Sequence, residues 1–108
     1  MALVLKEDKT WIDPFGTEHI IAVACPFEVT GSGCKQYEIL NIGIWKDLNS
    51  RDTGNKPWAT FHYRITGEEF TTYFSKTVLN QININPYSQA GQWLLNCSGD
   101  FDDWEVDI

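Results

Sequence analysis

Two strand-like segments carry the side chains of this chain that are best suited to bind a ligand. Gln36–Lys46 and Pro57–Thr66 flank the polar loop Asp47–Lys56. An antiparallel pairing of the two segments gathers tryptophan, amide, imidazole and guanidinium groups on one face of a sheet. Stacked tryptophans beside hydrogen-bonding groups suit a sugar ring or another planar ligand. This candidate ligand site or interface consists of Asn41, Trp45, Trp58, His62 and Arg64.

The hydrophobic pattern selects one register for this pairing. When Leu40 faces Tyr63, one face is apolar throughout, and the other face carries the candidate site with Trp45 opposite Trp58. A slip by one residue would mix the two faces. A cross-strand tryptophan pair also stabilises a hairpin without any ligand, and the N-terminal segment or a second subunit could cover it. The sequence is therefore compatible with either a ligand site or a structural contact on this face.

No recognised catalytic or metal-binding motif occurs in the sequence. His19 and His62 are the only side chains that ordinarily titrate near neutral pH, and no motif places a nucleophile against either one. Asp47–Asp52 begins like a calcium loop, but Arg51 stands where a third oxygen ligand is needed. Gly31–Gly33 leads into a strand, whereas a phosphate loop leads into a helix. We therefore expect no cofactor and no metal, and an enzyme is the less favoured interpretation.

Composition and charge limit the classes of partner. With 43% hydrophobic and 21% charged residues, the 108-residue chain is typical of a single soluble domain over residues 1–108. The net charge of −7 arises largely in an acidic tail, residues 100–108, and the rest is close to neutral. No basic patch is available to follow a phosphate backbone, so we expect no direct nucleic-acid binding. An acidic inhibitor that mimics nucleic acid is one alternative.

The sequence indicates a protein of the cell interior. The longest apolar run, Ile20–Cys25, is far shorter than the roughly 20 residues of a membrane helix, and the N-terminus has too short an apolar core for a secretion signal. Cys25, Cys34 and Cys97 are odd in number and show no Cys-x-x-Cys spacing. We therefore expect free, buried thiols in a reducing cytoplasm and no membrane partner.

The segment Asn85–Cys97 has the clearest helix signals. Asn85 suits the N-cap, and Pro86 suits the first helical position because its missing N–H is not needed there. Apolar residues at i, i+3, i+4 and i+7 predict one buried stripe, formed by Ala90, Trp93, Leu94 and Cys97. We expect this helix to cover the apolar face of the paired strands.

Further strands are expected in the first third of the chain. Ala2–Leu5 and Thr10–Ile12 are short candidates, and Asp13–Gly16 has the residues of a type I turn. Glu18–Val29 contains a run that is apolar on both faces, which favours a central strand. Pro26 cannot donate to a neighbouring strand, so an edge, a bulge or the strand end is expected there.

Four later segments have less uniform signals. Thr30–Gly33 is expected to be a turn. Glu69–Lys76 combines helical spacing and a capping-box pattern from Thr66 with aromatic and β-branched residues; we expect a strand, with a helix as the alternative. Residues 77–99 carry no charge, which indicates packing or contact with a partner. The tail would add a short last strand or lie against the sheet.

Together these patterns predict an α+β fold with an antiparallel β-sheet of five to six strands and a C-terminal helix packed on one face. Open sheet edges and the uncharged segment favour a homo-oligomer, and a dimer is the form we expect.

The C-terminal part of the chain resembles a group of phage proteins. The residues that carry the resemblance are Asn85-Pro86-Tyr87-Ser88-Gln89-Ala90, then Trp93-Leu94-Leu95, then Phe101-Asp102-Asp103 and Val106-Asp107. They look like the C-terminal end of small proteins encoded among the tail genes of tailed phages and prophages, although Gly91 stands where that group has an aromatic residue. The resemblance implies an interaction, assembly or accessory protein of a phage or other mobile element, in the host cytoplasm or associated with the virion. Its partner would be another protein; a small molecule or sugar is the alternative.

Overall fold

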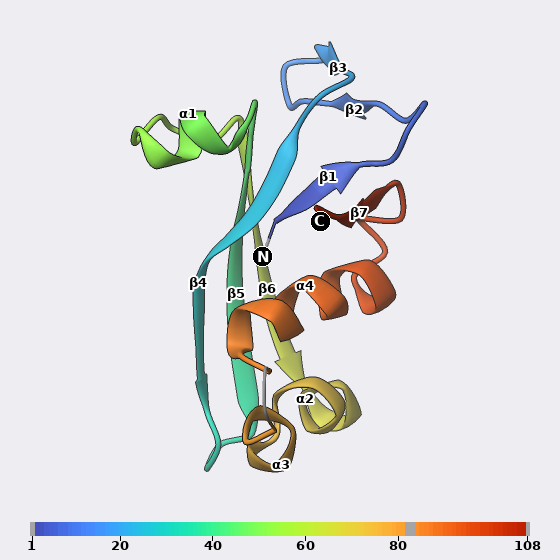
Figure 1. The fold of residues 1–108 in the computed structure, drawn as a ribbon. Helices are drawn as coiled ribbons and strands as arrows, with labels where there is room; N and C mark the ends of the chain where they lie inside the picture. The colour runs from blue at the N-terminus through green and yellow to red at the C-terminus, as the bar shows by residue number, and fades with distance from the viewer. Residues whose placement is uncertain (1, 82–83, 108) are drawn as a thin grey trace.

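The computed structural model describes residues 2–81 and 84–107 and shows the α+β fold expected from the sequence (Figure 1). Within this part of the chain, five strands form one antiparallel sheet in the order β6-β5-β4-β1-β7. These strands are β1 (Leu3–Leu5), β4 (Val23–Ser32), β5 (Tyr37–Trp45), β6 (Ala59–Thr66) and β7 (Trp104–Val106). The separate hairpin consists of β2 (Trp11–Ile12) and β3 (Glu18–His19). The helices are α1 (Leu48–Asp52), α2 (Gly67–Phe74), α3 (Lys76–Leu79) and α4 (Pro86–Cys97).

The pairing of β5 with β6 has the predicted register. Leu40 pairs with Tyr63, and Ile44 pairs with Ala59. Leu40 and Ile44 are buried on the face that α2 and α4 cover. The alternation of apolar and polar residues therefore sufficed to set the register of this strand pair.

Strand β4 begins later than predicted. It starts at Val23, whereas Glu18 and His19 belong to the separate hairpin. Ile20 and Ile21 lie between the hairpin and β4, with exposed fractions of 75% and 67%. The apolar run at 20–25 is therefore buried only from Ala22 onward.

The predicted irregularity at Pro26 is a β-bulge. The pairing of β4 with β5 shifts by one residue between Pro26 and Glu28. Proline has no N–H to give to a ladder, so a bulge accommodates it. The turn that follows lies at residues 33–36 rather than at Thr30–Gly33, because β4 continues to Ser32.

Residues 67–74 form helix α2, so the predicted strand at Glu69–Lys76 is wrong and the helical alternative is correct. Phe70 and Phe74 lie one turn apart and are both buried. Their packing outweighs the β-propensity of the aromatic and threonine residues between them. Thr66 is the N-cap but makes no capping hydrogen bond through its side chain, so the predicted capping box does not form.

Helix α4 begins as its sequence predicts. The Asn85 Oδ1 atom accepts a hydrogen bond from the Ser88 N–H at 2.9 Å, and Ser88 Oγ accepts one from the Asn85 N–H at 3.3 Å. This reciprocal capping satisfies two amides at the start of the helix. Ala90, Trp93 and Leu94 are buried as predicted, whereas Cys97 is exposed.

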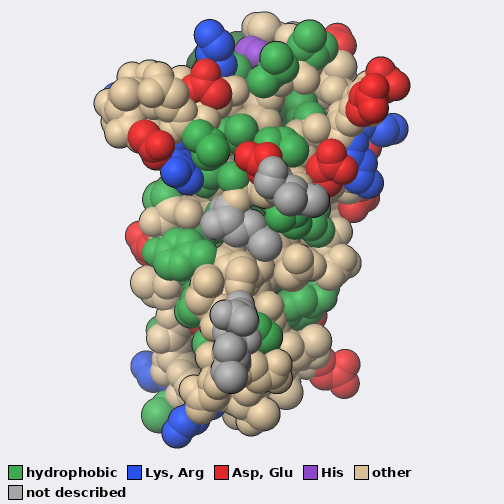
Figure 2. All heavy atoms as spheres, viewed as in Figure 1, with side chains coloured by type: hydrophobic (Ala, Val, Ile, Leu, Met, Phe, Trp, Pro, Cys, Tyr) green, Lys and Arg blue, Asp and Glu red, His purple; other side chains and the backbone are tan. Residues whose placement is uncertain are grey.

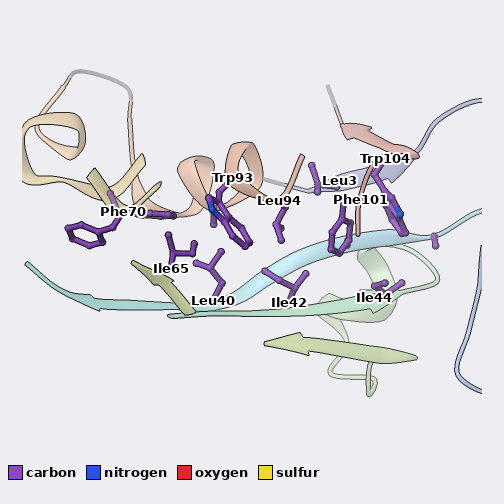
Figure 3. Packing of buried hydrophobic residues seen from close by; sticks show 14 residues of the cluster. Leu3, Leu40, Ile42, Ile44, Ile65, Phe70, Trp93, Leu94, Phe101 and Trp104 are labelled. Atoms are coloured by element: carbon purple, nitrogen blue, oxygen red, sulfur yellow. The ribbon is translucent and has the colours of Figure 1, made fainter. Parts of the chain in front are cut away.

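One hydrophobic core fills the space between the sheet and the helices (Figure 3). The acidic tail contributes to this core, since Phe101 and Trp104 are buried and β7 pairs with β1. The tail therefore forms the short last strand that was one of its two expected structures. The core side chains labelled in Figure 3 are Leu3, Leu40, Ile42, Ile44, Ile65, Phe70, Trp93, Leu94, Phe101 and Trp104.

A smaller cluster lies apart from this core and comprises Ala2, Val23, Cys25 and Trp45.

All three cysteines are free, but only Cys25 is buried; Cys34 and Cys97 are exposed. Burial raises the pKa of the Cys25 thiol, and the guanidinium of Arg51, 3.3 Å from its Sγ atom, opposes that rise. The prediction of free thiols is confirmed, and the prediction of burial holds for Cys25 alone.

Candidate functional site

Three residues of the predicted ligand site lie together on the sheet face away from the main core. Asn41 pairs with His62 across β5 and β6, and Asn41 Oδ1 lies 2.7 Å from His62 Nδ1. The guanidinium of Arg64 lies over the ring of Tyr37, 4.7 Å from its centroid. Binding of a small molecule or sugar to this polar face stays a prediction.

Trp45 and Trp58 do not form the predicted cross-strand pair. Trp45 is buried, its ring covers the Cα of Gly43, and its Nε1 donates to the carbonyl of Asn55 at 2.9 Å. Gly43 makes this possible because a Cβ there would collide with the indole. Trp58 precedes β6 and packs against the main core. These two residues therefore do not form the stacked surface on which the sugar-binding interpretation was based.

Trp58 instead belongs to an aromatic stack that attaches the β2–β3 hairpin to the sheet. Its ring centroid lies 4.0 Å from that of His19 and 6.2 Å from that of Trp11. Trp11 and His19 pair directly across the hairpin. No local pattern links these three residues, so sequence reasoning missed the stack. The predicted strand at Thr10–Ile12 and the predicted turn at Asp13–Gly16 did indicate parts of the hairpin itself.

Asp13 fixes the geometry of this hairpin. Its Oδ1 atom accepts hydrogen bonds from the N–H groups of Phe15 and Thr17, both at 2.9 Å, and its Oδ2 atom lies 2.9 Å from His19 Nε2. The bond with His19, followed by the backbone bonds, lowers the pKa of Asp13 below its ordinary value. Gly16 supplies the left-handed backbone of the turn, with a φ of 87°. Through these bonds Asp13 connects the turn to His19 of β3.

The hairpin and the residues just after it expose four large apolar side chains, which we call the apolar tip. Their exposed fractions are 62% for Ile12, 92% for Phe15, 75% for Ile20 and 67% for Ile21. Figure 2 shows hydrophobic side chains gathered at this end of the molecule. Isolated exposed apolar residues are ordinary, whereas a large contiguous apolar patch on a surface is typical of an interaction site.

A hollow of about 430 Å³ lies beside the apolar tip. Its volume falls within the range of sites that receive a small ligand or a large side chain. Ile20 and Ile21 belong both to the tip and to the wall of this hollow. The lining residues are Glu18, His19, Ile20, Ile21, Lys46, Asp47 and Trp58.

The described parts of the chain, 2–81 and 84–107, contain no cluster of three or more His, Cys, Asp or Glu side chains arranged to hold a metal ion. Over the same residues, no helix combines the length and the apolar character needed to cross a membrane.

Comparison with known proteins gives no match: no protein-family model, no curated protein and no solved structure is similar to this chain.

Proposed function

We propose that this chain is a non-enzymatic interaction protein that binds a protein partner through the apolar tip. The observation that supports the proposal is the exposure of Ile12, Phe15, Ile20 and Ile21 on one end of the molecule. Full burial of a side chain of this size is worth roughly 1.5–3 kcal/mol, so a partner that covers the tip gains substantial binding free energy. The aromatic stack and Asp13 hold the hairpin in place for such contact.

The partner that we propose is a second copy of this chain. A two-fold interface uses the same patch on both copies, so the patch must complement itself. The hairpin has both features that this requires: Phe15 protrudes, and the neighbouring hollow lined by Ile20, Ile21 and Trp58 can receive an aromatic ring. In the proposed dimer, Phe15 of each copy enters the hollow of the other.

Analytical ultracentrifugation tests this assignment. The unmodified chain should sediment as a concentration-dependent dimer, and Phe15→Asp should sediment as a monomer because it would bury a carboxylate at the interface. Phe27→Asp is the matched control, because Phe27 is also exposed, at 50%, but lies on the β4 bulge outside the tip. The control variant should remain dimeric. A chain that is monomeric at every concentration, or a dimer that survives Phe15→Asp, would overturn the proposal.

The resemblance of residues 85–107 to phage tail-gene products adds a biological setting to this proposal. An assembly or accessory protein of a phage or another mobile element, present in the host cytoplasm or on the virion, would use such a contact surface. Genes for tail or other structural phage proteins beside the coding sequence would support this setting. A neighbourhood of ordinary metabolic genes would contradict it.

A further inference from the structure

Glu38 is the one charged residue among those described whose side chain is almost wholly buried, with an exposed fraction of 7%. It lies on β5 and faces Gly31 of β4 and Ile65 of β6 in the register of the sheet. Ile65 belongs to the main core, so Glu38 extends the buried row of β5 residues toward α2 and α3. A carboxylate taken out of water carries a high cost unless it is paired. Whether this carboxyl group meets a protein partner or open space therefore decides what it can bind.

The described residues offer Glu38 no partner. None of them forms a hydrogen bond or an ion pair with its carboxyl group, and burial alone raises its pKa. The carboxyl group lies against Gly31, where a Cβ would collide with it. No described side-chain oxygen or nitrogen is both sealed from solvent and without a hydrogen bond. The Glu38 carboxyl is therefore accessible from the cavity beside it.

That cavity has a volume of about 460 Å³ and lies between β4, β5 and the helices α2 and α3. Its apolar wall consists of Val29, Phe70, Phe74, Leu79 and Pro86. Lys76 is the other charged residue that lines the cavity, and it is exposed. A cavity with an apolar wall and an unpaired carboxyl group that is accessible from it suits a ligand that has an apolar body and a positively charged end.

We propose that this cavity binds a small primary amine with an apolar body and that Glu38 holds its ammonium group. The body would lie against Phe70 and Phe74, and the ammonium group would replace the missing partner of the carboxylate. A free amine and an amino acid share this chemistry. An amino acid would in addition present a carboxylate, for which Lys76 is the available cation.

Titration followed by NMR of the backbone amides tests the proposal with defined probes. Phenethylamine should shift the amide signals of Gly31, Leu79 and Asn80, and 2-phenylethanol, which has the same body without the charge, should bind at least about tenfold more weakly. L-Phenylalanine separates the two sources of ligand. If L-phenylalanine binds more tightly than phenethylamine and Lys76→Met weakens that binding, the ligand is an amino acid. If L-phenylalanine binds more weakly than phenethylamine, the ligand is a free amine. Equal binding of the alcohol and the amine would overturn the proposal.

Glu38→Gln isolates the role of the charge. It keeps the shape of the side chain and should weaken phenethylamine binding about tenfold, while the alcohol is unaffected. Since an ionised Glu38 binds the amine, affinity should rise with pH through the pKa of Glu38, and Glu38→Gln should abolish that dependence. In the unmodified protein, amide chemical-shift changes caused by phenethylamine that lie away from the cavity would by themselves refute the site. The proposal is also refuted if phenethylamine does not bind and Lys76→Met changes the pKa of Glu38. That result would show that Lys76 is the ion-pair partner of the carboxylate.

Discussion

Trp93 lies in the main core, where its ring has an aromatic neighbour and its indole N–H has a hydrogen-bond acceptor. Its ring meets Tyr63 edge to face, with centroids 5.1 Å apart, and its Nε1 donates to Glu69 Oε1 at 2.8 Å. Trp93→Ala should therefore lower the free energy of unfolding by about 3–5 kcal/mol, because it leaves a cavity in the core. Urea denaturation followed by circular dichroism measures the loss.

Tyr87→Ala provides the control on the same helix. Tyr87 is 44% exposed, so its removal should change stability by about 0.5 kcal/mol or less. Similar effects at the two positions would show that α4 does not pack through the Trp93 side of the helix.

The neighbours against which Trp45 and Trp58 pack were harder to predict than the register of the strands beside them. Trp45 and Trp58 were both expected on the open sheet face, and neither is available there. The Trp45 ring turns back over Gly43, a direction that depends on the missing Cβ of another residue. Trp58 is drawn to the opposite face by Trp11 and His19, which come from a distant part of the chain. Strand alternation describes neither effect.

The β2–β3 hairpin is too short to be stable alone, since each strand has two residues. Its position depends on the Trp58 stack and on Asp13. Asp13→Ala should release the hairpin, and the indole N–H signals of Trp11 and Trp58 should move toward their solvent-exposed positions in NMR spectra. The Trp93 signal, which belongs to the core, should stay in place and serves as the internal control.

Acid should reproduce the same release in the unmodified chain. The hydrogen bonds of Asp13 lower its pKa from the ordinary value of 3.8, so their contribution is complete above that value and is lost as pH falls through the lowered pKa. The Trp11 and Trp58 signals should therefore move only below about pH 3.8. An identical acid transition in Asp13→Ala would assign it to another carboxyl group.

Among the elements, those with a regular local pattern were predicted and those decided by distant packing were not. The β5–β6 register follows from alternation alone, and α4 follows from its cap and its apolar stripe. Helix α2 was only the alternative expectation because its composition favours a strand, whereas the burial of Phe70 and Phe74 decides its structure. The predicted start of the strand at residues 18–22 was wrong because an apolar sequence looks the same whether its side chains are buried or exposed.

At the scale of the whole molecule, the acidic tail is a structural element and a charged surface at once. Phe101 and Trp104 are buried, whereas Asp102, Asp103 and Glu105 are exposed. Deletion of residues 101–108 should therefore unfold the chain, and replacing the exposed acids by Asn and Gln should leave the fold intact. Thermal unfolding followed by circular dichroism distinguishes the two variants. If the chain is an acidic inhibitor, the neutralised variant is the one that tests it, because deletion removes the core as well.

The two ends of the described chain lie side by side. Leu3 pairs with Val106, and the Asp107 N–H donates to the Ala2 carbonyl at 3.0 Å. Folding must therefore bring together residues about as far apart in sequence as this chain allows. The chain loses the corresponding loop-closure entropy when β7 pairs with β1. A circular permutant with these ends joined by a short linker and new ends opened in the exposed segment 52–56 would be relieved of that entropy loss. In such a topology β1 and β7 would form a local hairpin, and the slowest closure would shift to the pairing of β5 with β6.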